Sequence, residues 1–254
     1  MNDPVGKNGA AWTHNNNAPT RMKKIRTLFL SGANNHDWRL STPYCWLLLG
    51  RTGRFSTTVT TDPSATLENA GGLKEYDLFF MDYNGPAWSA AAQRNFEAAV
   101  SGGTGLVILH AADNAFVGWT EFEKMVGLLW RDGTGHGRFH EFPVTITDKS
   151  HPITRSLGDF KTTDELYHRL VHLHGVKCQT LATAYSSAES GGTGGAEPAM
   201  VATQYGRGRV FHMVLGHIWP GDGPPNMIAF ENQGFQQGLI RGCEWAATGD
   251  ATIQ

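Results

Sequence analysis

The chain has 254 residues, of which 40% are hydrophobic and 17% charged, and its formal net charge is −2. This length and composition are typical of one large globular domain with a well-buried core, and they exclude a disordered chain. No basic stripe is present, which argues against nucleic acid and against an anionic membrane surface as partners. No apolar stretch approaches the roughly 20 residues that a membrane-spanning helix needs.

The three cysteines, Cys45, Cys178 and Cys243, are widely spaced and form no CxxC pair. Neither a disulfide framework nor a thiolate zinc site is therefore expected. Cys45 and Cys243 lie in apolar helical contexts, which predicts buried thiols. The amino terminus lacks the apolar region of a secretory signal. These features together predict a cytoplasmic protein.

Residues 1–22 are polar and show no periodicity, so they are interpreted as an N-terminal arm. The folded domain is predicted at residues 23–249, and residues 250–254 are interpreted as a C-terminal tail. The first part of the domain alternates short apolar runs, typical of buried parallel strands, with amphipathic helical patterns. Strands are predicted at residues 25–30, 54–60, 76–81 and 105–110, and helices at residues 42–49, 90–100 and 120–129.

The alternation of strands and helices ends after residue 130. Residues 131–137 form a glycine-rich loop, and residues 139–147 alternate as an antiparallel or edge strand does. Further strands are predicted at residues 181–185, 199–205 and 210–215, and a closing helix at residues 230–247. This order of elements predicts an α/β three-layer sandwich, in which a mostly parallel sheet carries added antiparallel strands.

Polar loops follow four of the predicted strands. They bring His36, Tyr83, His110 and His217 directly after apolar runs. In an open parallel α/β sheet, the loops at the carboxyl ends of neighbouring strands meet at one crevice, where ligands bind. The sequence therefore predicts one site built from these loops.

Eight short motifs occur in a specific order along the chain. They are Asn35-His-Asp-Trp38, Leu109-His-Ala-Ala-Asp-Asn114, Gly135-His-Gly137, His151-Pro-Ile-Thr-Arg155, Asp164-Glu-Leu-Tyr167, Tyr205-Gly-Arg-Gly-Arg-Val-Phe211, Leu215-Gly-His217 and Glu244-Trp-Ala-Ala-Thr-Gly249. With these motifs the chain resembles the ThuA-like family, named for trehalose utilisation, over roughly residues 23–249. The resemblance implies a flavodoxin-like, doubly wound sheet similar to that of class I glutamine amidotransferases. It also implies a link to disaccharide catabolism, through sugars that partner dehydrogenases oxidise to 3-keto forms.

Glutamine hydrolysis can be tested on the residues themselves. Amidotransferases of this fold carry a nucleophilic cysteine at the turn after a central strand. In this chain His110 occupies that turn, and Cys45 and Cys178 are each more than sixty residues away. No GxSxG motif offers a serine instead. A glutamine amidotransferase activity is therefore not expected.

Four residues are candidates for acid–base catalysis: His36, His110, Glu165 and His217. His217 follows a glycine, which allows a ligand to approach closely. Purely structural roles are the alternatives. His110 could be a core histidine whose ring nitrogens are hydrogen-bonded, and His36 could simply occupy a loop position. Asp164, next to the candidate Glu165, is expected to bond to backbone groups.

Substrate contacts are predicted from aromatic and polar side chains near the same crevice. Aromatic faces pack against the apolar faces of sugar rings, while polar groups fix the orientation of the sugar. Each aromatic side chain is also a candidate core residue. The predicted substrate-binding residues are Asp37, Trp38, Tyr83, Asn114, His136 and Trp219.

A metal site is a further candidate, with His36, His136 and His217 as its ligands. Imidazole and carboxylate ligands suit zinc, iron or nickel better than magnesium, so the candidate cofactor is a zinc-like divalent metal. The chain has no HExxH motif, which leaves the sequence signal for a metal suggestive only. A second histidine group, His168, His172 and His174, is interpreted as a solvated face.

These features predict an enzyme of carbohydrate metabolism that acts on a sugar or glycoside, with a 3-keto sugar as candidate substrate. A keto group acidifies the adjacent C–H bond, so isomerisation or elimination needs a base and a group that stabilises the enolate; hydrolysis is a further option. The alternative is a non-catalytic sugar-binding or accessory subunit of a sugar dehydrogenase system. Candidate partners are therefore a small-molecule sugar, a sugar dehydrogenase and a second copy of the chain.

Overall fold

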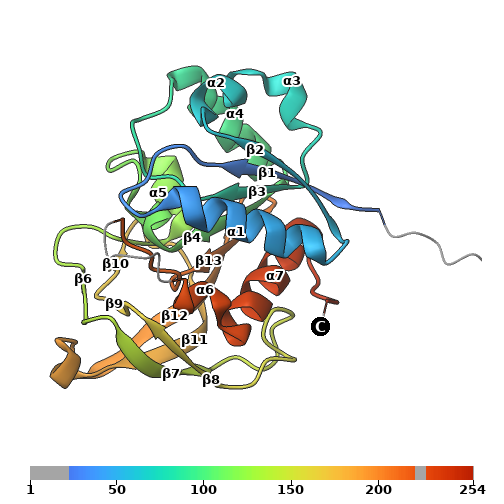
Figure 1. The fold of residues 1–254 in the computed structure, drawn as a ribbon. Coiled ribbons are helices and arrows are strands. Elements are labelled where there is room, and N and C mark those ends of the chain that lie inside the picture. Colours follow the sequence, from blue (N-terminus) through green and yellow to red (C-terminus); the bar gives the residue numbers. More distant parts are fainter. Residues whose placement is uncertain (1–22, 221–226, 254) are drawn as a thin grey trace, which may run out of the picture.

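A nine-stranded sheet runs through the centre of the computed structural model, which describes residues 23–220 and 227–253 (Figure 1). The strand order is β2-β1-β3-β4-β13-β12-β11-β7-β8. In chain order these strands are β1 (Ile25–Leu30), β2 (Phe55–Thr60), β3 (Leu78–Met81), β4 (Gly105–Leu109), β7 (His140–Ile146), β8 (Phe160–Asp164), β11 (Gln179–Ser186), β12 (Gly195–Tyr205) and β13 (Gly208–Met213). Two short ladders pair β5 (Leu128–Leu129) with β10 (Val171–His172) and β6 (Gly135–His136) with β9 (Tyr167–His168).

The sheet has a parallel half and an antiparallel half. Strands β2, β1, β3, β4 and β13 are parallel to one another. Beyond β13, the strands β12, β11, β7 and β8 are all antiparallel. The fold is therefore the predicted mostly parallel α/β sheet with added antiparallel strands.

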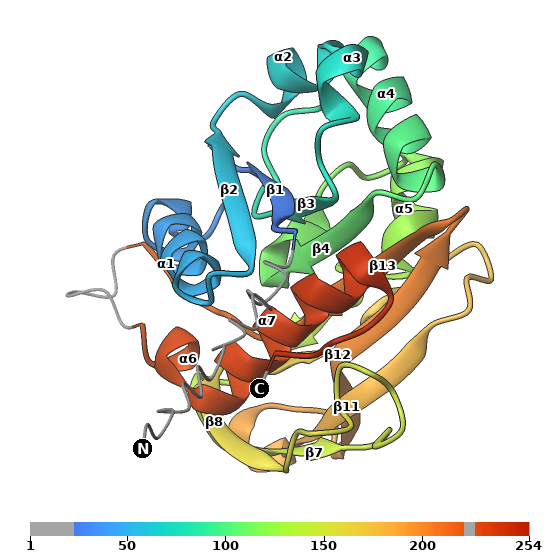
Figure 2. The ribbon, with the colours of Figure 1, turned by 90° about the vertical axis from the view of Figure 1, so that its right-hand side faces the viewer.

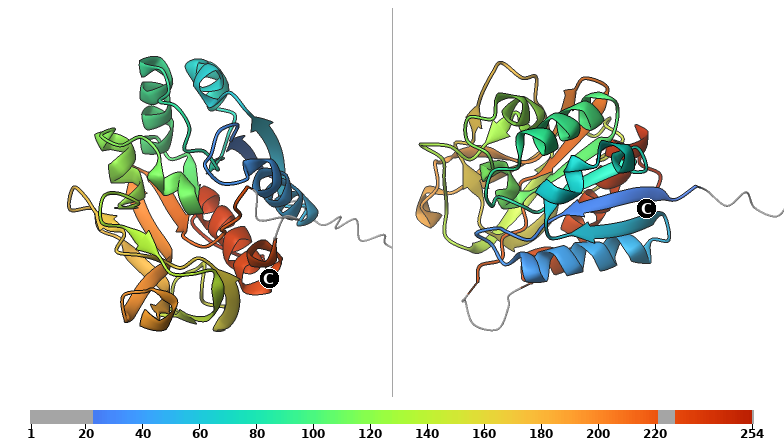
Figure 3. Two further views of the ribbon diagram at one scale, coloured as in Figure 1. Left: turned by 60° about the vertical axis from the view of Figure 1, so that its left-hand side comes forward. Right: turned by 90° about the horizontal axis from the view of Figure 1, so that it is seen from above.

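Helices cover both faces of the sheet, as Figures 2 and 3 show. The helices are α1 (Trp38–Arg51), α2 (Pro63–Glu68), α3 (Ala70–Leu73), α4 (Ala90–Ser101), α5 (Thr120–Val126), α6 (Ile228–Glu231) and α7 (Gln233–Thr248), with 3-10 turns η1 (His110–Asn114) and η2 (Ala188–Ser190). One apolar core lies under α1 and α7 and contains Phe29 and Phe80. The second lies under α2 to α5 and contains Leu28 and Phe79. Successive side chains of one strand thus enter opposite cores, which makes the three-layer sandwich.

Three helices differ from the predicted boundaries. Helix α1 begins at Trp38, four residues before the expected start, so Pro43 lies inside the helix. Helix α5 ends at Val126 because Gly127 has a φ of +78°. The predicted helix over residues 230–247 is divided at Asn232, whose side-chain oxygen accepts the first free N–H groups of α7.

The residues after Gly249, expected as a tail, fold back onto α7. Ala251 is buried, and the Glu244 carboxylate accepts the N–H groups of Thr252 and Ile253 at 2.7 and 2.9 Å.

Cys45 and Cys243 are buried, as predicted. The predicted arm over residues 1–22 lies outside the described residues. Within the described part of the chain, no helix combines the length and the apolar character that crossing a membrane requires.

A candidate active site of converging histidines

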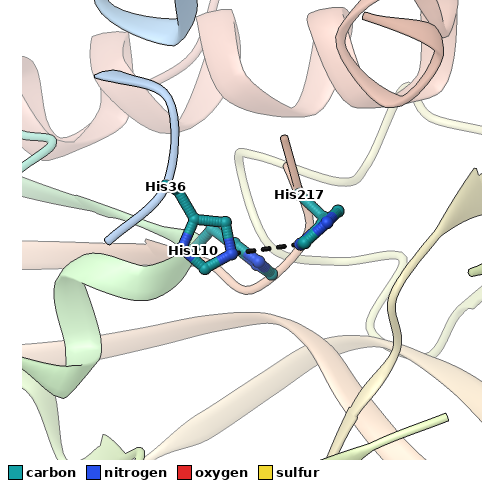
Figure 4. Close-up of side chains that lie close together, drawn as sticks. All are labelled: His36, His110 and His217. Atoms are coloured by element: carbon teal, nitrogen blue, oxygen red, sulfur yellow. Dashed lines mark hydrogen bonds between the residues drawn. The ribbon is translucent and has the colours of Figure 1, made fainter. Parts of the chain in front are cut away.

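Three histidines from distant parts of the chain meet at the carboxyl ends of the parallel strands (Figure 4). His36 lies in the loop after β1, His110 directly follows β4, and His217 lies four residues after β13. One ring nitrogen from each histidine lies within 4.8 Å of the other two. The closest pair is His36 Nε2 and His217 Nδ1, at 3.0 Å. The structure thus brings together three of the four predicted acid–base candidates.

His110 occupies a backbone conformation that is unusual for a residue with a side chain. Its φ is +43°, at the turn where β4 passes into η1. Such conformations cost energy and persist where the surrounding structure holds them, as they do at many functional sites. The ring of His110 stacks on Tyr167 with 4.1 Å between centroids. The turn therefore directs the imidazole away from the strand and into the histidine cluster.

Hydrogen bonds define which nitrogen of His110 carries its proton. Nδ1 lies 2.6 Å from the carbonyl oxygen of Val214. A carbonyl only accepts hydrogen bonds, so Nδ1 is the donor and Nε2 holds a lone pair. That Nε2 is buried and has no hydrogen-bond partner among the described residues.

An amide network fixes the loop that carries His36. The Asn34 side chain accepts the His36 N–H at 2.9 Å and donates to the buried Asp82 carboxylate at 2.9 Å. Asn84 accepts the N–H of Asn35 at 2.9 Å and donates to the carbonyl of Ala111 at 3.0 Å, which joins this loop to the turn at His110. The polar residues after β1, β3 and β4 therefore act together to place the imidazoles.

His217 is placed by a buried carboxylate. Asp164 accepts the N–H groups of Gly216 and His217 at 2.8 and 3.0 Å, and that of Glu165 at 2.8 Å. Burial raises the pKa of Asp164 to about 7, although these three N–H donors act in the opposite direction. The prediction that Asp164 bonds to backbone groups is confirmed.

Glu165 directs its carboxylate between two imidazoles. Its Oε2 lies 3.1 Å from Nδ1 of His217 and 3.3 Å from Nδ1 of His136. Nδ1 of His136 also lies 2.8 Å from the carbonyl oxygen of Gly137. The structure groups His110, and not the predicted His136, with His36 and His217.

Burial keeps the imidazoles of His36 and His110 uncharged. Burial, with smaller contributions from the neighbouring His217 and His136, lowers the pKa of His36 to about 3. Burial also holds the pKa of His110 well below its ordinary value, with smaller contributions from His36 and His217. At neutral pH both rings therefore offer lone pairs.

A pocket of about 190 Å³ opens beside this cluster. Its walls are both aromatic and polar, which is the pattern of small-molecule sites. The lining residues are Asn35, His36, Ala111, Asn114, Trp130, His136, Glu165, Tyr167 and Trp219.

Some lining residues were expected from the sequence and others were not. Asn114, His136 and Trp219 were predicted to contact substrate, and they line the pocket. Trp130 and Tyr167 were missed. Trp130 follows a strand of only two residues, which leaves no periodic signal, while Tyr167 lies in the Asp164-Glu-Leu-Tyr167 motif and could have been inferred from it.

Three predicted substrate-binding residues lie outside the described lining of this pocket. Tyr83 packs in the apolar core, where its hydroxyl donates to the carbonyl of Pro86 at 2.8 Å, and its contact with a sugar stays a prediction. Asp37 precedes α1 without capping it through its side chain. Trp38 is the first residue of α1, with the Arg39 guanidinium 4.4 Å from its ring centre.

The interpretation of His168, His172 and His174 as a solvated face is wrong for His168 alone, because His172 and His174 are exposed. His168 is buried on β9, where its ring packs against Gly135. His174 pairs with Glu123, with 2.9 Å between Nε2 and Oε2. Short ladders such as β6–β9 bury side chains that a search for longer periodic strands does not identify.

Comparison with known proteins identifies the family. The model of the ThuA family, described as trehalose utilisation, matches residues 7–246. The chain belongs to the ThuA family. This membership supports a carbohydrate-related function in general. No curated protein matches the chain significantly.

Solved structures agree with the ThuA assignment. A putative ThuA-like protein from Parabacteroides merdae is 35% identical, with a TM-score of 0.82 over 91% of this chain and 93% of that one. A putative ThuA-like protein from Bacteroides uniformis is 18% identical, with a TM-score of 0.65 over 96% and 97%. The Salmonella typhimurium cytoplasmic protein STM3548 shares the fold, with 11% identity and a TM-score of 0.57 over 88% and 99%.

Proposed function

We propose that this ThuA-family chain is an enzyme that performs acid–base chemistry on a carbonyl-bearing sugar, with a 3-keto sugar or glycoside as the substrate class. The observation that carries the proposal is the position of Glu165. Its carboxylate lies between two imidazoles, 3.1 Å from that of His217 and 3.3 Å from that of His136, at a pocket with aromatic walls. A carboxylate beside two proton carriers can accept, hold and return a proton within one site.

The aromatic side chains support a sugar as the ligand. Trp130, Tyr167 and Trp219 all line the pocket, and Trp219 is 47% exposed although it is a large apolar side chain. Indole and phenol rings cover the C–H faces of a sugar ring, while Asn35 and Asn114 offer amide groups to its hydroxyls.

The reaction begins when Glu165 removes the proton from the carbon next to the sugar carbonyl. The electron pair of that C–H bond moves to the carbonyl oxygen and forms an enolate, which an imidazole N–H stabilises by donation. For isomerisation, the hydroxyl on the deprotonated carbon passes its proton to the enolate oxygen and becomes the new carbonyl, while Glu165 returns its proton to the former carbonyl carbon. Departure of a glycosidic oxygen from the adjacent carbon gives elimination, and that oxygen takes a proton from an imidazole.

The test is proton exchange in deuterium oxide. The purified chain is incubated with 3-keto-glucose or a methyl 3-keto-glucoside, and proton NMR follows loss of the signal next to the carbonyl and formation of product. We expect exchange with the wild type and a loss of about 10²- to 10⁴-fold in the Glu165→Gln variant. His172→Ala, which removes an exposed histidine on β10, serves as the control and should keep full exchange.

The same experiment distinguishes the alternative function. Saturable binding of the keto-sugar without exchange or product would contradict the enzymatic proposal. It would support a sugar-binding or accessory subunit of a sugar dehydrogenase system instead. A cytoplasmic location and a dehydrogenase partner are part of the proposal, and the unpaired state of all three cysteines is compatible with such a location.

A further inference from the structure

We propose that His36, His110 and His217 bind one zinc-like divalent metal ion, with Glu165 beside it. The three imidazoles come from loops after β1, β4 and β13, and a ring nitrogen of each lies within 4.8 Å of the others. This set replaces the predicted one, because it includes the buried His110 in place of the exposed His136.

The first argument is the lone pair of His110. Its Nδ1–H is used by the Val214 carbonyl at 2.6 Å, so Nε2 can only accept. The side chain is 2% exposed, and its Nε2 has no partner among the described residues. A buried polar atom without a partner costs stability, and a cation at this position would satisfy it.

The second argument is the close approach of His36 and His217. Nδ1 of His36 lies 3.1 Å from the side-chain oxygen of Asn35, which makes Nδ1 the donor and leaves Nε2 as an acceptor. That Nε2 lies 3.0 Å from Nδ1 of His217. Nδ1 of His217 also lies 3.1 Å from Oε2 of Glu165, so in the metal-free chain its proton is shared between Glu165 and His36. A metal ion at this point would take the place of that proton and accept the lone pairs of both ring nitrogens.

The third argument is the support around the rings. Histidines that bind metals donate their second N–H to a carbonyl, amide or carboxylate, which fixes the ring and its tautomer. Val214 performs this role for His110 and Asn35 for His36. Asp164 holds the backbone of His217. Two of the three imidazoles thus have the supporting contacts that metal-binding histidines make, and the backbone of the third is fixed.

The distances and the ligand types indicate the kind of metal. Tetrahedral zinc with bonds of 2.0–2.1 Å places two ligand nitrogens about 3.3 Å apart. The separations observed, 3.0 Å for the closest pair and at most 4.8 Å for any pair, bracket that value. Three neutral imidazoles select zinc-like metals over magnesium or calcium, and three protein ligands with an open position are typical of catalytic rather than structural zinc.

The inference concerns the same pocket as the proposed function, but its test needs no sugar. The full chain is treated with a chelator, which is then removed, and titrated with Co²⁺ followed by visible absorption and with Zn²⁺ followed by calorimetry. We expect one equivalent of either metal, with the absorption of four- or five-coordinate Co²⁺. Because the loss of supporting contacts alone weakens binding 10- to 100-fold, His110→Ala should bind at least about 100-fold more weakly.

Two further variants identify the ligand set. His136→Ala should still bind one equivalent, since its ring does not belong to the group of three that converge, and His172→Ala should match the wild type. Wild type without stoichiometric binding, or equal weakening in His172→Ala and His110→Ala, would overturn the inference. Should His110→Ala fail to fold, imidazole nitrogen NMR of the wild type decides, because zinc must shift three histidines and leave His172 unchanged.

Metal binding and turnover can fail separately. Stoichiometric binding without exchange of the keto-sugar proton would support the metal site and contradict the proposed reaction. Exchange of the keto-sugar proton by protein that binds no metal would support the proposed reaction and contradict the metal site.

Discussion

The parallel and antiparallel halves of the sheet differ in how they bury their strands. In β1, β3 and β4 nearly every side chain is buried, because helices cover both faces. In β7 buried and exposed side chains alternate, so one face of that strand is solvated. The first half therefore provides a rigid platform, and the second provides loops and short ladders that close over its end.

The candidate site lies across the boundary between these halves. His36 and His110 follow strands of the parallel half, whereas Glu165 and His136 belong to segments that accompany the antiparallel strands. His217 follows β13, the strand that pairs with both halves. In terms of the two proposals, the parallel half would hold the metal ion and the antiparallel half would carry the base, Glu165.

The strongest test of this division separates metal binding from turnover. We expect His36→Ala to lose metal affinity by about 100-fold or more, since it removes a ligand. Glu165→Gln should retain one equivalent of metal and lose about 10²- to 10⁴-fold in exchange of the keto-sugar proton. Co²⁺ titration and NMR exchange on the same preparations provide both readouts. Loss of metal in both variants to the same degree would show that the two halves do not act separately.

Alanine substitutions at two glycines compare how readily each half of the sheet gives way to an added methyl group. A Cβ on Gly105 would lie 2.4 Å from the backbone oxygen of Ala246, which α7 fixes in place. A Cβ on Gly234 would lie 2.2 Å from Cγ of Phe160, so this half-buried side chain must take another χ1 rotamer to make room. We expect Gly105→Ala to cost about 3 kcal/mol or more of unfolding free energy and Gly234→Ala about 1 kcal/mol.

Urea denaturation measures both costs, and Gly158→Ala is the matched control. Nothing lies within 4 Å of a Cβ at Gly158, so this variant should stay within about 0.5 kcal/mol of the wild type. Equal costs at Gly105 and Gly234 would contradict the greater rigidity of the parallel half.

A smaller effect concerns a buried pair beneath the site. His212 on β13 has its Nε2 3.6 Å from Oδ2 of Asp113, and both side chains are buried. Burial lowers the pKa of His212 to about 3, so between that value and 6.5 the unfolded state binds one more proton here. Its contribution to stability is therefore complete above pH 6.5 and is lost as the pH falls toward 3.

Replacing His212 by Asn removes this pH dependence. Between pH 7.5 and 5.0, the wild type should lose about 2 kcal/mol more unfolding free energy than His212→Asn in chelator-treated samples. Burial raises the pKa of Asp113, which acts with the opposite sign, but Asp113 is present in both proteins and the difference isolates His212. Parallel curves for the two proteins would show that His212 is charged in the folded state.

The sequence predicted the parallel half closely and the antiparallel half less well. The run Ile25–Leu30 is recovered with its bounds unchanged, because a fully buried strand is a continuous apolar segment. Strand β8 was missed, since Phe160–Asp164 contains a lysine and two threonines and gives no apolar run. The early start of α1 was missed because it depends on hydroxyl groups of Ser41 and Thr42 that reach Asp82, a tertiary contact.

The candidate site was predictable in part, because several of its residues directly follow strands that the sequence identifies. Residues that follow strands were placed correctly near the crevice, as His36, His110 and His217 show. The sequence predicted His136 in the cluster, whereas the structure has His110 there. This difference could not be predicted, because the position of the His110 ring depends on a positive φ at residue 110 and on the carbonyl of Val214. The position of Trp130 at the pocket could not be predicted from the sequence, since the strands next to it have only two residues each.

The pairing of β4 with β13 has a consequence for the order of folding during synthesis. Leu106 pairs with Val210 and Leu109 with Met213, so more than one hundred residues separate partners in adjacent strands. Until the ribosome has released residue 213, β4 is an unprotected apolar edge strand, which invites association with other chains. The strand that precedes His110 therefore keeps an unpaired edge until most of the chain has been synthesised.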